Sequence, residues 1–368
     1  MFNSIYIFYK GHFYFNIKSV IFAFLVFHLT FINKLFKNYE KTKIGVISCN
    51  HHVNIGNNLV KYSMFIFLTK CGYEPQIIGS NYQNYNISFL KKYVNVRTIN
   101  KFSEIKQNDY KILIVNSDQS WRKWDKDFYD IAFLKFAKNW NINKFTYAVS
   151  LGFNEWEFTK EDDNIAKELL KNFTGISVRE NNSVKLIKQY IGFNSLLVLD
   201  PTMIINKKYY LNIIKKYKSN YKNDNYIFIY VVNFAKPLKD MSVMDNLIKN
   251  SIELFNYKKV IVSLYDIDAI EKFLSGIYYS KAVITNSFHA TIFSIIFKKP
   301  FISFRTNDDE RLNSLRETLD LKSRIIEYDK QPDINLLKQP LSFNIAKFNY
   351  YKKRSIKYLK NHLNLKIY

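Results

Sequence analysis

Short apolar runs alternate with longer amphipathic stretches along most of this chain, and this alternation constrains its fold more than any other feature. Most of these runs are apolar almost throughout rather than at every second position, which is typical of strands buried on both faces. The first series of runs covers residues 43–49, 75–78, 94–97, 111–115, 145–149, 175–178 and 196–199. The second series covers residues 226–231, 259–262, 282–284 and 301–304. Parallel strands with helices between them form covered sheets, so the two series predict two Rossmann-like, doubly wound α/β domains.

Breaks in this pattern suggest the domain boundaries. We expect an N-terminal Rossmann-like domain at residues 41–205 and a C-terminal Rossmann-like domain at residues 206–368. The sequence Asp200-Pro201-Thr202 interrupts the first series, and the helix after it is interpreted as a hinge. Residues 345–365 are expected to form a helix that packs back on the body.

Residues 1–40 are predicted to hold a hydrophobic N-terminal helix with basic flanks. Its apolar part, residues 19–33, carries no formal charge and has lysines on both sides. This part is shorter than the roughly 20 residues that span a bilayer, and no small-residue cleavage site follows it. Two interpretations stay open: a helix that lies in the membrane interface, and a helix that packs on the body or on a partner.

The formal net charge of +24 favours anionic partners, such as nucleic acid, a membrane surface or acidic substrates. The basic residues are spread along the chain without a known nucleic-acid-binding motif, so we expect no nucleic-acid partner. A solvated basic surface is the first interpretation, and attraction to anionic lipid is the next. Two cysteines outside any CxxC pair fit a reducing compartment. The expected location is therefore the cytoplasm, with peripheral contact to the inner face of the cell membrane.

Polar side chains recur where the predicted strands end, at the edge where doubly wound sheets bind ligands. The clusters are residues 50–57, 116–121, 150–152, 179–180 and 285–289. In the last cluster, His289 lies in a turn before a predicted helix, whose N-terminal N–H groups favour anions. An imidazole at this point could hold a phosphate or move a proton, so an anionic substrate is the first hypothesis.

Together the clusters resemble the polysaccharide pyruvyl transferase family, in the family's order and spacing, over roughly residues 43–324. The motifs that carry the resemblance are Asn116-Ser117-Asp118-Gln119-Ser120-Trp121, Tyr147-Ala148-Val149-Ser150-Leu151-Gly152, Ser177-Val178-Arg179-Glu180, Leu199-Asp200-Pro201-Thr202, Thr285-Asn286-Ser287-Phe288-His289, Phe293-Ser294 and Lys299-Pro300-Phe301. Two positions depart from the family pattern. Asn116 replaces a usual glycine, and Ala290 replaces the usual glycine after the histidine.

The resemblance implies a GT-B-like arrangement and transfer of pyruvate from phosphoenolpyruvate to two hydroxyls of a sugar, giving a cyclic ketal. The acceptor would be a glycan or a lipid-linked sugar, as in exopolysaccharide or capsule precursors. Arg179 would bind the donor, since its planar fork suits a carboxylate or phosphate. His289 would be the catalytic proton donor, and Asp118 would bind or deprotonate an acceptor hydroxyl. Ser287 and Asn286 would contact the anionic groups of the donor.

Structural alternatives stand beside these assignments. Arg179 could pair with Glu180, His289 could be a core residue, and Asp118 could cap a turn. The whole protein could instead be a GT-B-like glycosyltransferase that uses a nucleotide sugar, or a non-catalytic glycan-binding family member. Asp-Xaa-Asp patterns at residues 125–127 and 266–268 are weak signals for a metal site. We expect no metal and no cofactor, with phosphoenolpyruvate as the donor substrate.

Overall fold

The computed structural model describes residues 8–9, 12–13, 41–48, 54–80, 87–123, 127–217, 221–222, 224–232, 241–261 and 268–364. Contacts within the chain divide it into a unit from Met1 to Thr42 and a unit from Lys43 to Tyr368. In the first unit, β1 (Phe8–Tyr9) pairs with β2 (His12–Phe13) as an antiparallel hairpin. These strands differ from the helix predicted for residues 1–40, and their aromatic residues favour strands. The apolar stretch at residues 19–33 lies outside the described residues.

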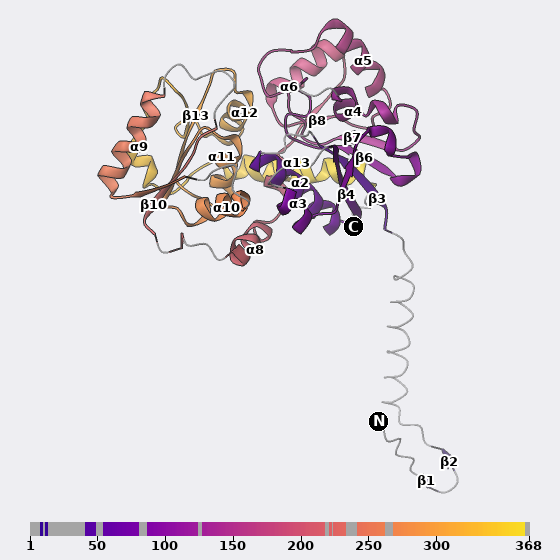
Figure 1. Ribbon diagram of the computed structural model, residues 1–368, viewed down its shortest axis with the longest axis horizontal. Helices are drawn as coiled ribbons and strands as arrows, with labels where there is room; N and C mark the ends of the chain where they lie inside the picture. The colour runs from indigo at the N-terminus through magenta and orange to yellow at the C-terminus, as the bar shows by residue number, and fades with distance from the viewer. Residues whose placement is uncertain are drawn as a thin grey trace. The chain divides into compact units, whose positions relative to one another are not determined.

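The first large sheet has five parallel strands in the order β5-β4-β3-β6-β7 (Figure 1). The strands are β3 (Lys43–Ile47), β4 (Glu74–Ser80), β5 (Val96–Ile99), β6 (Ile112–Val115) and β7 (Asn143–Thr146). The connecting segments are α2 (Ile55–Lys70), α3 (Ile87–Tyr93), η1 (Phe102–Glu104), η2 (Gln107–Asp109), α4 (Phe128–Phe133), η3 (Lys135–Ala137) and α5 (Lys160–Leu170). The strand order reverses between β3 and β6, as in other doubly wound sheets.

A shorter parallel pair extends this sheet edge. It consists of β8 (Ser177–Val178) and β9 (Leu196–Leu197), with α6 (Asn181–Leu186) and the π-helical turn η4 (Ile187–Ile191) between them. Single bridges join Asp118 to Val149 and Val149 to Val178. The segment that contains Val149 therefore lies between the backbone after β6 and the backbone that leads into Arg179.

The second large sheet also has five parallel strands, in the order β11-β10-β12-β13-β14. The strands are β10 (Tyr226–Tyr230), β11 (Lys258–Ile261), β12 (Ala282–Thr285), β13 (Phe301–Arg305) and β14 (Ile325–Glu327). The other segments are α7 (Pro201–Ile204), α8 (Lys208–Tyr217), α9 (Ser242–Phe255), α10 (Ala269–Tyr279), α11 (Phe288–Ile296), α12 (Glu310–Leu319) and η5 (Ile334–Leu337). Two parallel sheets with helices between their strands confirm the predicted α/β class.

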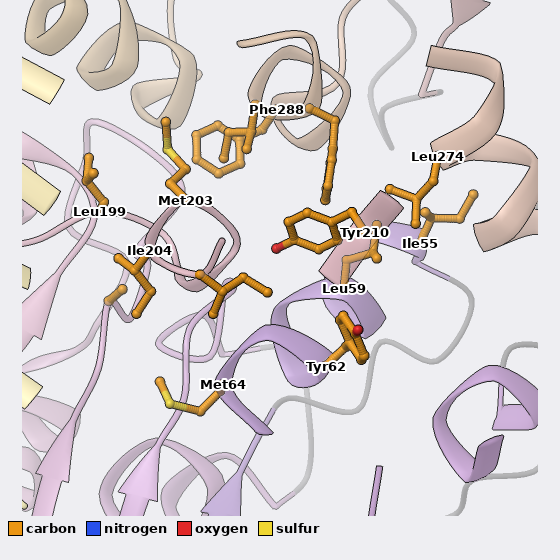
Figure 2. Packing of buried hydrophobic residues seen from close by; sticks show 14 of the residues in the cluster. Ile55, Leu59, Tyr62, Met64, Leu199, Met203, Ile204, Tyr210, Leu274 and Phe288 are labelled. Carbon is orange, nitrogen blue, oxygen red and sulfur yellow. The ribbon is translucent and has the colours of Figure 1, made fainter. Parts of the chain in front are cut away.

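One hydrophobic core contains side chains from both large sheets and from the helices that pack on them (Figure 2). Tyr210 of α8 is fully buried in this core, and its ring meets that of Phe293 edge-on, with 4.9 Å between the ring centroids. The Tyr210 hydroxyl donates to the carbonyl oxygen of Thr202 and lies 2.8 Å from it, so the buried polar atom is satisfied. Ser63 of α2 lies 2.7 Å from the same hydroxyl. Burying an aromatic ring of this size contributes about 2–3 kcal/mol.

The C-terminal helix α13 (Ile345–His362) packs on residues near the first sheet. Its Tyr358 hydroxyl donates to the carbonyl oxygen of Thr146 at 2.9 Å. Its Ser355 hydroxyl oxygen accepts from the backbone N–H of Leu199 at 2.8 Å. None of the helices in the described ranges combines the length and the apolar character that a membrane crossing requires.

Candidate active site

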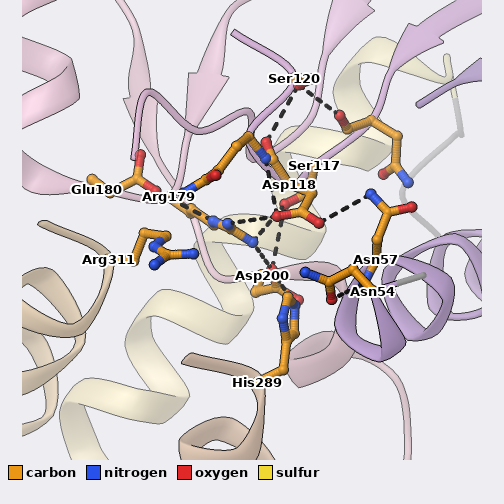
Figure 3. Close-up of polar contacts among 12 residues, drawn as sticks. Asn54, Asn57, Ser117, Asp118, Ser120, Arg179, Glu180, Asp200, His289 and Arg311 are labelled. Carbon is orange, nitrogen blue, oxygen red and sulfur yellow. Dashed lines mark hydrogen bonds and ion pairs between the residues drawn. The ribbon is translucent and has the colours of Figure 1, made fainter. Parts of the chain in front are cut away.

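The candidate site lies where each large sheet reverses its strand order. In the first sheet this point is between β3 and β6, and in the second it is between β10 and β12. Loops that leave neighbouring strands in opposite directions create a ligand-binding crevice at such points. α2 follows β3, the Asp118 loop follows β6, and α11 follows β12. Figure 3 shows side chains from these segments directed toward one another.

Asp118 is held in an uncommon backbone conformation at the end of the β6 loop. Its φ angle is 81°, in the left-handed region that few residues other than glycine, asparagine and aspartate adopt. Its Oδ1 atom accepts from Nη2 of Arg179 at 3.1 Å, and its Oδ2 atom accepts from Nδ2 of Asn57 at 3.0 Å. The loop thus presents a buried carboxylate that both an arginine and the first turns of α2 hold in place.

The Arg179 guanidinium is surrounded by three carboxylates. Its Nη1 atom lies 2.7 Å from Oδ2 of Asp200, and its Nε atom lies 3.2 Å from Oε1 of Glu180. Asp118 is the third partner, and the Arg179 side chain is only 1% exposed. Burial alone would lower the pKa of Arg179, but the three carboxylates raise it above its ordinary value. Burial also raises the pKa of Glu180, and the charge of Arg179 offsets part of that rise.

Asp200 connects the two halves of the site. Its Oδ1 atom caps α7 by accepting from the backbone N–H of Thr202 at 2.9 Å. Its Oδ2 atom accepts from Arg179 and lies 3.8 Å from Nε2 of His289. Burial would raise the pKa of Asp200, but its contacts with His289 and Arg179 hold that pKa well below the ordinary value. Asp200 is therefore an ionised carboxylate between a guanidinium and an imidazole.

His289 lies in the first turn of α11 and is almost fully buried. Its Nε2 atom is buried and has no hydrogen-bond partner among the residues that the structure describes. Its Nδ1 side packs against Gly56 of α2, where an added Cβ would lie 1.9 Å from Nδ1. The helix backbone and Asp200 thus hold the ring on two sides. The orphaned Nε2 atom is suited to a proton exchange with a bound substrate.

The similarity of this chain to a known family extends over most of this region. The sequence profile described as polysaccharide pyruvyl transferase matches residues 54–308, well over half of the chain. The chain belongs to the polysaccharide pyruvyl transferase family. The matched range of this family member includes Asp118, Arg179, Asp200 and His289, and it ends before α12.

Solved structures of sugar-nucleotide proteins share the fold of this family member. The co-structure of S. aureus MnaA with UDP is similar at 13% identity and a TM-score of 0.57, covering 89% of this chain and 98% of that one. The UDP-GlcNAc 2-epimerase of Methanocaldococcus jannaschii is similar at 11% identity and a TM-score of 0.51, covering 87% of this chain and 99% of that one. At such identities the likeness shows the fold alone, which is GT-B-like. Among curated proteins, no sequence matches this chain.

Two of the predicted donor-binding residues of this family member, Asn286 and Ser287, form hydrogen bonds with backbone groups of the second sheet's own loops and helix. The Asn286 side chain accepts from the backbone N–H of Val232 at 2.7 Å and donates to the carbonyl oxygen of Val232 at 2.9 Å. It thereby ties the loop after β12 to the loop after β10. Ser287 caps α11 by accepting from the backbone N–H of Ala290 at 3.4 Å. Contact of Asn286 and Ser287 with an anion stays a prediction.

The structure brings Arg179, Asp118 and His289 together. It adds Asp200, which the sequence placed in a family-like motif without assigning it a role in the site. Arg179 also pairs with Glu180, as its structural alternative predicted. Asp125 and Asp266, from the weak Asp-Xaa-Asp patterns, lie outside the described residues. The described part of the chain contains no group of three His, Cys, Asp or Glu residues placed to hold a metal ion.

Proposed function

We propose that this protein transfers the pyruvyl group of phosphoenolpyruvate to two hydroxyls of a sugar in a surface-glycan precursor, forming a cyclic ketal. The family gives the reaction class. The observation that carries the proposal is the pair of His289 and Asp200, in which a buried Nε2 atom without a hydrogen-bond partner among the described residues lies 3.8 Å from an ionised carboxylate. This geometry supports an imidazolium that gives its proton to a substrate.

The first step is protonation of the donor. The proton on Nε2 of His289 moves to the methylene carbon C3, and the electron pair of the carbon–carbon double bond forms the new C–H bond. The imidazole becomes neutral, and C2 acquires positive charge that the enol oxygen shares. Asp200 stabilises the protonated imidazole before this step, because it supplies a counter-charge in a site from which water is largely excluded.

The second step is attack of two hydroxyls on C2. The first sugar hydroxyl forms a C–O bond, and its proton passes to a base, the role we propose for Asp118. The bond between C2 and the phosphate oxygen then breaks, and phosphate leaves with the electron pair and takes the proton that Asp118 holds, which restores the carboxylate. The second hydroxyl attacks C2 and closes the ring, and neutral His289 accepts its proton. Asp118 and His289 thus each accept the proton of one sugar hydroxyl.

We assign Arg179 to positioning within this mechanism. A donor anion could reach its guanidinium only by replacing one of three buried carboxylate partners, whereas orienting Asp118 and Asp200 requires no rearrangement. Breaking a buried ion pair of this kind costs about 3–5 kcal/mol. Direct contact with the donor, as predicted for Arg179, would therefore cost more free energy than the positioning role.

The acceptor is proposed to be a lipid-linked sugar on the cytoplasmic face of the membrane. The net charge of +24 and the uncharged apolar stretch at residues 19–33 support a peripheral association with anionic lipid. Such an association would bring the enzyme to its acceptor.

A binding and turnover assay tests the proposal against its alternatives. Phosphoenolpyruvate should raise the melting temperature, and phosphate should be released when p-nitrophenyl hexosides are supplied as acceptors. A UDP-sugar serves as the control ligand. Stabilisation by the UDP-sugar and not by phosphoenolpyruvate would favour a glycosyltransferase. No turnover with either donor would favour a non-catalytic glycan-binding protein.

A further inference from the structure

A cavity lies at the amino ends of the strands of the first sheet, at the edge opposite the candidate active site. Its lining comes from the starts of β3, β4 and β5 and from the segment of η2 that precedes β6. These strands are neighbours in the sheet, in the order β5-β4-β3-β6. The volume is about 280 Å³, close to the lower end of the roughly 300–1,000 Å³ that small-molecule sites occupy. The cavity therefore has room for one small polar molecule.

Hydrogen bonds join the side chains on one side of the cavity into a chain. Nη1 of Arg97 donates to Oδ2 of Asp109 at 2.7 Å and to the Tyr110 hydroxyl oxygen at 3.2 Å. The Tyr110 hydroxyl donates to Oε1 of Gln76, whose Nε2 atom donates to Oδ1 of Asn95 at 3.2 Å. Tyr110 is only 3% exposed, so its ring anchors this chain in the core. Side chains held in this way lose little conformational freedom when a ligand arrives, which favours binding.

Other polar groups around the cavity are available to a ligand. The side chains of Lys43, Glu74 and Asn108 form no hydrogen bond or ion pair within the described part of the chain. All three residues are exposed. Water solvates such groups in the free protein, and ligand hydroxyls can replace that water with bonds of similar strength. The cavity therefore combines a fixed wall with unused donors and acceptors.

The formal charges around the cavity cancel. Lys43 and Arg97 are positive, and Glu74 and Asp109 are negative. Burial would raise the pKa of Asp109, but hydrogen bonds from the backbone of Lys106 and from Arg97 lower it, so this carboxylate is ionised at neutral pH. A phosphate or a metal ion would be attracted by one pair of charges and repelled by the other. The charge balance therefore favours a neutral ligand.

The kinds of polar group around the cavity favour a ligand with several hydroxyls. Amide groups such as those of Gln76 and Asn108 carry a donor and an acceptor side by side. Two adjacent hydroxyls of a sugar each donate and accept, so one amide can bond to both. Glu74 adds acceptors, and Lys43 adds donors. An apolar ligand would displace water from these groups without replacing its hydrogen bonds, which is costly.

We propose that this cavity is a second, non-catalytic site that binds one neutral sugar residue of a glycan. The two edges of the sheet lie roughly 17 Å apart at β3, which has five residues, so a sugar residue held here does not reach His289. The site holds the glycan on the protein and leaves the chemistry to the other edge. This inference goes beyond the proposed transfer reaction and does not need it.

Sugar binding to the full-length protein tests this second site. The probes are the methyl glycosides of glucose, galactose, mannose and N-acetylglucosamine, measured by saturation-transfer NMR without phosphoenolpyruvate. At least one should bind with a Kd in about the millimolar range. Asn108→Ala and Glu74→Ala should each raise that Kd about fivefold or more at an unchanged melting temperature, because these side chains have no partner among the described residues.

Matched control variants come from exposed positions outside the cavity. Asn349→Ala on α13 and Glu253→Ala on α9 should leave the Kd unchanged. A panel in which no glycoside binds, or an equal change of Kd in test and control variants, would overturn the proposal. Glucose 6-phosphate is the charged probe: tighter binding of this sugar than of methyl glucoside would contradict the argument from charge balance.

Turnover separates the second site from the transfer reaction. With a p-nitrophenyl hexoside as the acceptor, Asn108→Ala and Glu74→Ala should keep the kcat of the wild type, because the cavity lies at the other edge of the sheet. A loss of kcat in these variants would overturn the non-catalytic assignment. If a glycoside binds at the cavity but phosphoenolpyruvate does not react, the second site stands and the proposed transfer fails.

Discussion

The Nε2 atom of His289 lies 3.8 Å from the Oδ2 atom of Asp200, although α11 and α7 follow strands of different sheets. This pairing depends on the packing of the two halves, since each residue is positioned by its own helix. Asp200 in turn depends on Arg179, which lies 2.7 Å from the same oxygen. The proposed proton donor is therefore linked to a buried ionic network in the other half of the molecule.

Replacing Asp200 with asparagine should impair catalysis more than folding. The variant keeps the shape and the cap of α7 but removes the counter-charge of His289, so kcat should fall on the order of 10²–10⁴-fold. The free energy of unfolding should fall by roughly 3 kcal/mol, because a buried ion pair with Arg179 is lost. Steady-state kinetics and chemical denaturation of the purified variant measure both effects. A variant with wild-type kcat would contradict the role of Asp200.

The same variant should also change the acid sensitivity of the fold. The pKa of Asp200 is lower in the folded protein than in the unfolded chain, so its ionised form stabilises the fold above pH of about 4. This contribution is lost as the pH falls through the folded pKa. The melting temperature of Asp200→Asn should therefore decline less steeply than that of the wild type between pH 6 and 3. Asp329→Asn, in an exposed turn, is the control and should follow the wild-type slope.

Gly56→Ala should lower activity without a matching loss of helix. Alanine is favoured over glycine inside a helix by roughly 0.5–1 kcal/mol. Here, however, the new Cβ would lie 1.9 Å from Nδ1 of His289 and would displace the ring from Asp200. We expect a fall in kcat of more than about tenfold, since small misplacements of a catalytic group are costly. Gly276→Ala, which meets the Phe228 ring instead, is the control: it should lower stability but not the kcat of the folded protein.

Asp118→Asn tests whether this carboxylate acts as a base. Asparagine tolerates the φ of 81°, so the backbone should keep its conformation. Loss of the base should lower kcat about 10²-fold, and loss of the buried ion pair with Arg179 should lower the free energy of unfolding by roughly 3 kcal/mol, as in Asp200→Asn. A large fall in stability with unchanged kcat per folded molecule would instead make Asp118 a structural partner of Arg179.

Deleting residues 1–38 tests the proposed membrane association. The full-length protein should sediment with vesicles of phosphatidylglycerol and phosphatidylethanolamine, and less with phosphatidylcholine alone, because lysines attract anionic lipid. The truncated protein should lose most of this binding. Equal sedimentation of both proteins would argue against a lipid-binding role for the deleted segment.

The sequence predicted the two sheets well because their central strands, such as β6 and β10, are buried at every position. The run predicted at residues 111–115 is β6 (Ile112–Val115), and the run at residues 226–231 is β10 (Tyr226–Tyr230). β14 (Ile325–Glu327) was not predicted, since three residues at a sheet edge give too short an apolar run. The predicted division at residue 205 stays a prediction.

The candidate site was predicted only in part, and the reason is visible at Asp200. In sequence, an aspartate before a proline is typical of a helix N-cap, and Asp200 does cap α7. Its second role, as a carboxylate shared by Arg179 and His289, arises from contacts between segments far apart in the chain. No local pattern encodes such contacts.

Solvent deuterium in the product tests the central claim most directly. With phosphoenolpyruvate and an accepted p-nitrophenyl hexoside in D₂O, the wild type should place one non-exchangeable deuterium in the methyl group of the ketal, because the proton from His289 equilibrates with solvent. His289→Gln should form product at least about 10³-fold more slowly, with an unchanged melting temperature. A ketal without deuterium, or a His289→Gln variant that reacts as fast as the wild type, would contradict the account.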